Sequence, residues 1–176
     1  MNRTLLFLLT IILFSTACEG LQKEKETDDV SLNEAILNQE EKVFNTNQNR
    51  LQKQDAMALV NLYEKYANEN PKDTMSAEYL FRAADISMNI GRPGQTIRLF
   101  NRILTEYPDF EKAPATLFLM AFVYEDQLQD YDNAKKYYEL FLSKYPDSEF
   151  ADDAEISLKN LGKSPEELIR EFESNQ

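Results

Sequence analysis

The sequence predicts an all-α fold, arranged as an α-solenoid of about three antiparallel helix hairpins with C-terminal capping helices. One observation is periodicity, because apolar residues recur every three or four positions, as in Ala56, Val60, Tyr63 and Ala67. A second is composition, since four glycines in 176 residues disfavour hairpin-rich β folds. No stretch alternates between apolar and polar residues for long enough to predict a strand.

The third observation is an internal repeat. Shifting the chain by 38 residues superposes identical residues without a gap: Ala77 on Ala115, Ala83 on Ala121, Leu104 on Leu142, and Tyr107-Pro108-Asp109 on Tyr145-Pro146-Asp147. Self-similarity at a period of about 20 to 50 residues is the sequence signature of solenoids. The repeat therefore predicts two consecutive helix hairpins of the same design.

The composition also excludes several classes of function. The chain has no His, one Cys and a formal net charge of -12. It therefore cannot form a Ser-His-Asp triad, a His-ligated zinc site or a disulfide framework. No basic run is longer than Lys135-Lys136, which argues against a nucleic-acid partner because phosphate affinity needs clustered Lys and Arg. We predict no catalytic residue, no metal, no cofactor and no nucleic acid.

Residues 1–17 predict a secretory signal peptide. Arg3 supplies a positive start, residues 5–14 are apolar apart from Thr10, and the small residues Ser15-Thr16-Ala17 follow. Ten helical residues rise only about 15 Å, half the hydrocarbon thickness of a bilayer, so the segment is too short for a permanent span.

Cys18 is the predicted lipidation site. The small residues before it resemble the lipobox of bacterial lipoproteins, in which signal peptidase II cuts before a diacylated Cys. Ser15 stands where a lipobox usually has Leu, so cleavage by signal peptidase I, which would leave a soluble protein, remains an alternative.

Residues 18–30 are predicted to form an acidic tether. Residues 19–30 include only two apolar residues, too few to bury the surface that folding requires. Glu19, directly after Cys18, resembles the sorting signal of lipoproteins that are sent to the outer membrane, which implies a protein that faces the periplasm. The acidic residues also resemble export signals to the cell surface, and a plain spacer is the other interpretation.

Eight helices are predicted, at residues 31–45, 53–69, 75–90, 94–107, 112–128, 131–145, 149–161 and 165–174. Ser31 with Glu34, and Ser164 with Glu167, can form capping boxes. Gly91 and Gly162 suit helix C-caps, and Pro71, Pro108 and Pro146 each follow a helix. The domains are a degenerate N-terminal hairpin at 31–73, repeats at 74–111 and 112–148, and capping helices at 149–176.

The later repeat resembles the tetratricopeptide (TPR) family. Leu117-x2-Met120-Ala121-x2-Tyr124, Ala134-x3-Tyr138 and Pro146 stand at the spacings of W-x2-L-G-x2-Y, A-x3-F and P. The earlier copy reads Tyr79-x2-Arg82-Ala83-x2-Ile86, Thr96-x3-Phe100 and Pro108, so Arg82 and Thr96 depart from the pattern. The long repeats ending in Tyr-Pro-Asp, over residues 50–174, resemble periplasmic TPR lipoproteins of the BamD and CpoB type and short TPR lipoproteins of Bacteroidota.

The resemblance implies a partner-binding groove lined by the first helix of each hairpin. Residues 115–124 are apolar on every side of a helix, so something must cover them. The groove positions would be Phe118 and Phe122, with Leu80, Ala84 and Met88 from the earlier repeat. Alternatively, the neighbouring helices wrap this helix completely. If the groove interpretation is right, changing both Phe118 and Phe122 to alanine abolishes partner capture without unfolding the protein.

Three weaker patterns have structural explanations. Residues 91–96 look like a phosphate loop but lack its GK[ST] ending, so a helix stop and a proline-started helix are expected. Asp126, Asp130 and Asp132 lack the order of a calcium loop and predict capping. The carboxylates at 152, 153 and 155 predict a solvated helix face.

The sequence thus favours a non-catalytic TPR adaptor lipoprotein that binds an envelope protein or peptide in its groove. The alternative is a transport or secretion helper, pilotin-like or surface-exposed, that captures and releases a client. An enzyme is the third hypothesis.

Overall fold

A computed structural model describes residues 32–44 and 52–174 of the chain. The predicted signal peptide, Cys18, the acidic tether and the capping residue Ser31 lie outside the described residues. The chain divides into two compact units, Met1–Asn49 and Arg50–Gln176. In the first unit, residues 32–44 form one helix. The predicted hairpin at 31–73 spans both units, so only its separate helices are described.

The second unit contains the other helices: α2 (Lys53–Glu69), α3 (Thr74–Asn89), α4 (Pro93–Glu106), α5 (Ala113–Asp126), α6 (Tyr131–Lys144), α7 (Ala151–Asn160) and α8 (Pro165–Ser174). All predicted boundaries agree with these bounds to within two residues. The described residues include no strand. The fold is therefore an all-α, TPR-like solenoid, as predicted.

The helix ends follow the predicted capping chemistry. Gly91 and Gly162 adopt left-handed φ values of 70° and 73°, and each stands two residues after the last residue of its helix. The capping box before α8 is formed, since the Ser164 amide donates to the Glu167 carboxylate at 2.8 Å and the Glu167 amide donates to the Ser164 hydroxyl. The three predicted prolines follow α2, α4 and α6. These caps set where each hairpin turns.

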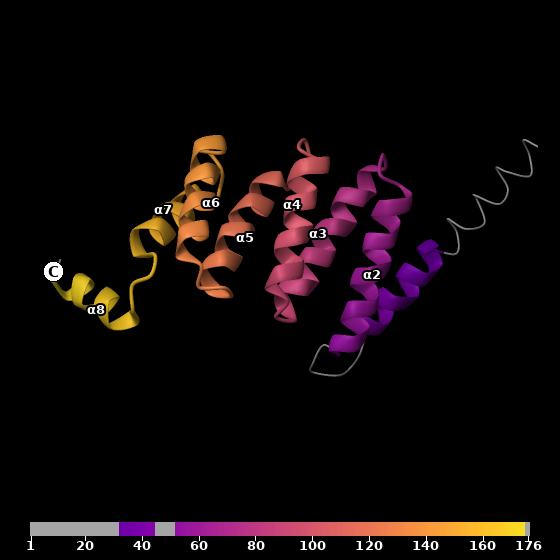
Figure 1. Ribbon diagram of the computed structural model, residues 1–176, viewed down its shortest axis with the longest axis horizontal. Helices are drawn as coiled ribbons and strands as arrows, with labels where there is room; N and C mark the ends of the chain where they lie inside the picture. The colour runs from indigo at the N-terminus through magenta and orange to yellow at the C-terminus, as the bar shows by residue number, and fades with distance from the viewer. Residues whose placement is uncertain (1–31, 45–51, 175–176) are drawn as a thin grey trace, which may run out of the picture. The chain divides into compact units, whose positions relative to one another are not determined.

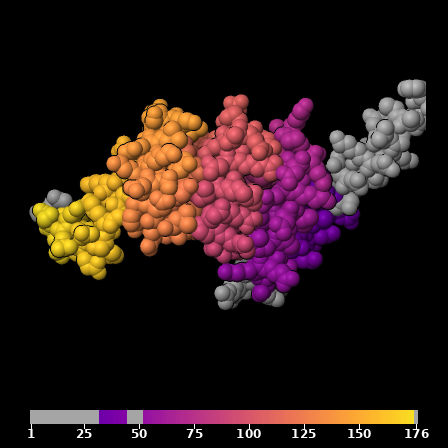
Figure 2. Space-filling model, in the orientation of Figure 1, coloured from indigo at the N-terminus to yellow at the C-terminus, as the bar shows by residue number. Residues whose placement is uncertain are grey.

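From α2 to α7 each helix packs on the next, and Figure 1 shows the helices following one another in chain order from α2 to α8. Figure 2 shows the same order as successive bands of surface. Side-chain bonds also connect alternate helices. Arg98 of α4 pairs with Glu64 of α2 at 2.8 Å, and Lys112 before α5 pairs with Glu78 of α3 at 2.7 Å. The helices therefore form two layers, with second helices α2 and α4 in one and first helices α3 and α5 in the other.

The repeat contains a one-residue length difference that corrects the gap-free alignment. Buried residues of α3 correspond to buried residues of α5 at a shift of 37: Leu80 with Leu117, Ala83 with Met120, and Ala84 with Ala121. The second helices keep the shift of 38, with Phe100 on Tyr138 and Ile103 on Phe141. Three residues separate α3 from α4, whereas four separate α5 from α6. Pairing Ala77 with Ala115 and Ala83 with Ala121 was therefore wrong by one residue.

The loop between α5 and α6 holds this extra residue in a strained conformation. Gln129 has a φ of 51°, a region that side chains with a Cβ rarely adopt. We expect Gln129→Gly to raise the free energy of unfolding by about 0.5 to 1 kcal/mol, because glycine adopts this conformation without the Cβ clash. Urea unfolding followed by circular dichroism measures the change.

Gly91 supplies the reciprocal control for this loop. Its φ is 70°, and a Cβ added there would meet no atom within 4 Å, so Gly91→Gln changes the backbone cost alone. It should destabilise the protein by a similar amount. If Gln129→Gly were neutral while Gly91→Gln was costly, the conformation at Gln129 would not be a source of strain.

Two tyrosines, Tyr138 and Tyr107, differ in the hydrogen bonding of their hydroxyl groups. Tyr138 is fully buried, and its hydroxyl donates to Glu125 at 2.8 Å. Burial raises the pKa of Tyr138, and the Glu125 carboxylate raises it further. The hydroxyl of Tyr107 is shielded from solvent and pairs with no group in the described part of the chain. Such a hydroxyl gives up its hydrogen bonds to water without replacement.

We expect Tyr107→Phe to leave the free energy of unfolding unchanged or raise it by up to about 1 kcal/mol. The substitution removes a hydroxyl that loses its hydrogen bonds to water on folding and forms none in the protein. Tyr138→Phe should instead cost about 1.5 kcal/mol, because it leaves the Glu125 carboxylate without its donor. Parallel urea titrations compare the two variants. Equal losses would mean that the Tyr107 hydroxyl has a partner in solution.

Candidate functional site

The first helices α3 and α5 lie side by side and are tied near both ends. Near their N-termini, the Lys112 ammonium donates to Glu78 at 2.7 Å. At their C-terminal ends, the Gln127 side-chain amide donates to the backbone carbonyl of Met88 at 3.1 Å. Because the links join corresponding ends, the two helices run parallel. Their outward surfaces therefore form one continuous area, which we call the α3–α5 face.

The two halves of the α3–α5 face differ in chemistry. On α3 the outward positions hold Glu78, Arg82 and Asp85, while the corresponding positions of α5, 37 residues later, hold Ala115, Leu119 and Phe122. Each set steps by four and then three residues, so it lies along one side of its helix. Phe122 is 38% exposed, and Ala115 and Leu119 are half-buried. A charged strip thus adjoins an apolar strip.

Glu78 organises the charged strip. Its two carboxylate oxygens accept from Arg82 at 3.0 Å and from Lys112 at 2.7 Å. Burial alone would raise the pKa of Glu78, but the hydrogen bonds and charges of Lys112 and Arg82 outweigh burial and hold that pKa below its usual value. Lys112 also lies over the ring of Phe81, 5.1 Å from its centroid. Glu78 is therefore ionised at neutral pH and fixes both cations.

The structure does not bring the five predicted groove residues together on the surface. Leu80 and Ala84 are completely buried, and Met88 is half-buried. Leu80 and Ala84 are thus core residues, a correction that follows from the one-residue shift in the repeat. At the corrected register, Phe118 matches Phe81, and Phe122 matches Asp85.

Of the two predicted groove phenylalanines, only Phe122 is exposed. The ring of Phe118 stacks on Phe150 at 5.2 Å between centroids and contacts Tyr138 and Phe141, both at 5.7 Å. Phe118 therefore joins α5 to α6 and to the start of α7. The expectation that both rings can be removed without unfolding does not fit this packing. The alternative, that neighbouring helices cover α5, is correct for Leu117, Met120 and Ala121, which are buried.

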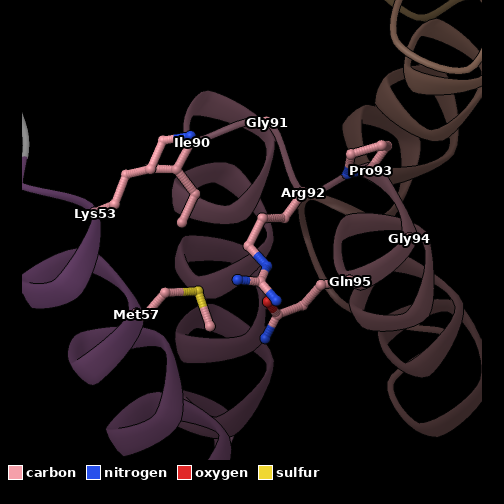
Figure 3. Close-up of a pocket in the computed structure, with 8 residues that line it drawn as sticks. All are labelled: Lys53, Met57, Ile90, Gly91, Arg92, Pro93, Gly94 and Gln95. Atoms are coloured by element: carbon pink, nitrogen blue, oxygen red, sulfur yellow. The ribbon is translucent and has the colours of Figure 1, made fainter.

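Residues 90–95, at the turn from α3 into α4, line a hollow of about 440 Å³ together with Lys53 and Met57 of α2. In Figure 3, the Arg92 side chain extends from this turn toward Met57 and Gln95. Gly91 ends the preceding helical turn and Pro93 is the first residue of α4. The turn follows a helix rather than a strand. It therefore ends α3 and begins α4, as predicted for a helix stop followed by a proline-started helix.

The predicted acidic patterns also take structural roles. Asp130 caps α6, accepting from the Asn133 amide at 3.1 Å and its side chain at 2.7 Å. Asp152, Asp153 and Glu155 are exposed on α7. Among the described residues, no group of three potential ligands could hold a metal ion. None of the described helices is both long enough and apolar enough to cross a membrane.

Comparison with known families supports this arrangement. Residues 78–109 and 115–148 each match the model of the tetratricopeptide repeat. No curated protein and no solved structure matches the chain. Repeats of this kind stack into extended surfaces that bind proteins.

Proposed function

We propose, from the premise that this chain carries two tetratricopeptide repeats, that it is a non-catalytic adaptor whose α3–α5 face holds a segment of a partner protein. The observation that carries the proposal is the apolar strip of Leu119 and Phe122 beside the charged strip of Arg82 and Asp85. An apolar patch that stays partly exposed on a surface with a polar rim is typical of partner sites. The absence of histidine from the sequence supports a non-catalytic role.

The chemistry of the face defines the partner segment. Apolar side chains of the segment would cover Leu119 and Phe122, where removing them from water gives about 25 cal/mol for each Å² buried. Polar or charged side chains would lie opposite Arg82 and Asp85. An amphipathic segment, helical or extended, has both kinds of side chain on adjacent strips. Glu78 and Lys112 hold the face in shape before the partner arrives.

Site-specific photo-crosslinking in cells tests this proposal. A photoreactive phenylalanine analogue replaces Phe122 on α5 in one variant and Leu140 on α6 in the other. The two native side chains are similarly exposed, at 38% and 36%, but belong to different helix layers. We expect a partner to crosslink from position 122 and not from position 140, and to be recovered in a fixed ratio after detergent extraction.

Binding strength gives a second measurement once the partner is crosslinked. Changing both Leu119 and Phe122 to alanine should weaken capture by at least about tenfold, whereas Leu140→Ala should not. Crosslinking that is equal from both layers, or arises from position 140 alone, would overturn the adaptor site. A scatter of clients in no fixed ratio would favour the alternative, a transport or secretion helper.

We also propose that the adaptor works in the cell envelope, tethered to the outer membrane through a lipid on Cys18 and facing the periplasm. Support comes from the sequence, where the only cysteine follows an apolar leader and a run of small residues. The acidic residues after it would keep the helical domain at a distance from the bilayer.

Mass spectrometry of the purified protein tests the anchor. The expected mature chain begins at Cys18 and carries acyl groups, and it partitions with membranes. Cys18→Ser should move the protein to the soluble fraction or leave its leader uncut. A mature chain that starts at an unmodified Cys18 would instead assign the cleavage to signal peptidase I. Protease accessibility in intact cells would distinguish the periplasmic from the surface-exposed arrangement.

A further inference from the structure

A second hollow lies apart from the α3–α5 face, where the end of α4 and the loop before α5 meet the first turns of α3. Its volume is about 540 Å³, comparable with small-molecule or side-chain sites. Its apolar lining consists of Ala77 from α3 and of Tyr107, Pro108 and Phe110 from the loop. Phe110 is held in place by an edge-on contact with Phe81. We call this hollow the α4–α5 cleft.

Three carboxylates also line the α4–α5 cleft. They come from Glu106, Asp109 and Glu111. Glu106 is paired with Arg102 at 2.8 Å, whereas Asp109 and Glu111 have no ion pair with any other described residue. The last carbonyls of α4 add partial negative charge at the same end. The cleft is therefore both apolar and electronegative.

The positive end of a neighbouring helix does not cancel this charge. Thr74, the first residue of α3, also lines the cleft. The N-terminus of α3 is already capped by Asp73, whose carboxylate accepts from the Met75 amide at 2.9 Å and from the Tyr66 hydroxyl at 2.7 Å. The hydrogen bond from Met75 and then that from Tyr66 hold the pKa of Asp73 below its usual value. A cation in the cleft would thus meet the carboxylates of Asp109 and Glu111, which form no ion pair within the described residues.

The internal repeat separates what the fold requires from what is specific to this cleft. Tyr107 and Pro108 recur 38 residues later as Tyr145 and Pro146, where they end the second hairpin. At the same shift, Asp109 and Glu111 recur as Asp147 and Glu149, whereas Glu106 is replaced by lysine and Phe110 by serine. Two carboxylates are therefore common to both corners, while the third carboxylate and the aromatic floor belong to the first corner alone. A hairpin can close without Glu106 and Phe110.

We propose that the α4–α5 cleft binds a lysine or arginine side chain of a partner peptide, together with an adjacent apolar side chain. The charged end would lie between Asp109 and Glu111, where charge-assisted hydrogen bonds to carboxylates are the strongest available. The aliphatic stem and the apolar neighbour would pack on Tyr107 and Phe110. The inference shares with the proposed function only the premise that the chain binds peptides.

Nuclear magnetic resonance titration of the full chain tests this site with a defined probe, acetyl-Phe-Arg-amide. The probe should shift the amide signals of Ala77, Asp109 and Phe110, while acetyl-Phe-Glu-amide should leave them unchanged. The variant Asp109→Asn with Glu111→Gln should bind the arginine probe at least about tenfold more weakly, because it removes the charge of both carboxylates that would hold the guanidinium.

The second repeat provides a matched control, Asp147→Asn with Glu149→Gln, which removes the same two charges at the corresponding positions. It should change affinity by less than about twofold, since exposed charges at a distance are screened. Equal weakening by both variants, or equal binding of both probes, would overturn the cleft. Signal shifts confined to Leu119 and Phe122 would also overturn it, yet would leave the proposed function standing. Cleft binding with no crosslink from position 122 would instead support the cleft and overturn the adaptor role of the α3–α5 face.

Discussion

Phe118→Ala is expected to lower the free energy of unfolding by about 3 kcal/mol, the low end for truncating a large aromatic side chain, because the ring is half-buried but in contact with three other rings. The loss is large because the ring stacks on Phe150 at 5.2 Å and also contacts Tyr138 and Phe141. Its removal leaves a cavity that borders α5, α6 and the start of α7. Urea unfolding of the purified protein, followed by circular dichroism, measures the change.

Phe122→Ala is the matched control, one helical turn further along α5. Its side chain is 38% exposed, so truncation should cost less than about 1 kcal/mol while removing apolar surface from the α3–α5 face. Comparable losses from the two variants would show that Phe122 is structural, and would take the α3–α5 face out of consideration. A stable Phe118→Ala protein would instead restore Phe118 as a groove residue.

Leu80→Ala is expected to cost a similar amount, about 3 kcal/mol, within the range measured for buried leucines. Leu80 is fully buried and occupies the same position in α3 as Leu117 in α5. If Leu80 lined a groove, truncation would weaken partner capture and leave stability nearly intact. Thermal and urea unfolding distinguish the two roles without knowledge of the partner.

Leu140 on α6 provides the reference for this substitution. It is 36% exposed, so Leu140→Ala should cost less than about 1 kcal/mol. Both substitutions remove the same atoms. The difference between their losses in free energy of unfolding therefore measures the effect of burial. A small loss at Leu80 would mean that the helices around α3 separate enough in solution to expose it.

Periodicity and capping residues were sufficient to predict the helices of this chain. The positions of Gly91, Gly162 and the Ser164 capping box depend on neighbours a few residues away, so the sequence carries them directly. The second helices also align correctly, because Thr96 and Phe100 stand 38 residues before Ala134 and Tyr138, at the same buried positions.

The groove residues could not be predicted in the same way, because their assignment depends on a register that a single residue shifts. Moving one position along a helix turns a side chain by about 100°, which carries Leu80 from the expected surface into the core. Arg82 indicates the shift in register, because the gap-free alignment pairs this charged residue with the buried Met120. A charged residue at a core position indicates a slipped alignment.

The contacts of Phe118 and the α4–α5 cleft were also not predictable from the sequence. Phe118 meets Phe150 only because the chain returns through α6, and nothing local encodes that contact. The cleft similarly combines Ala77 with Phe110 across a whole hairpin.

The two long-range ion pairs have a consequence for elasticity. Glu64–Arg98 fastens the α3–α4 hairpin to α2 through one layer, and Glu78–Lys112 fastens it to α5 through the other. Bending that opens either layer must stretch one of these bonds. From α5 to α8, no ion pair between different helices is found among the described residues. Opening either layer around α3 would thus work against an ion pair, whereas bending between α5 and α8 would break no such pair and would be resisted by apolar packing and the Tyr138–Glu125 hydrogen bond.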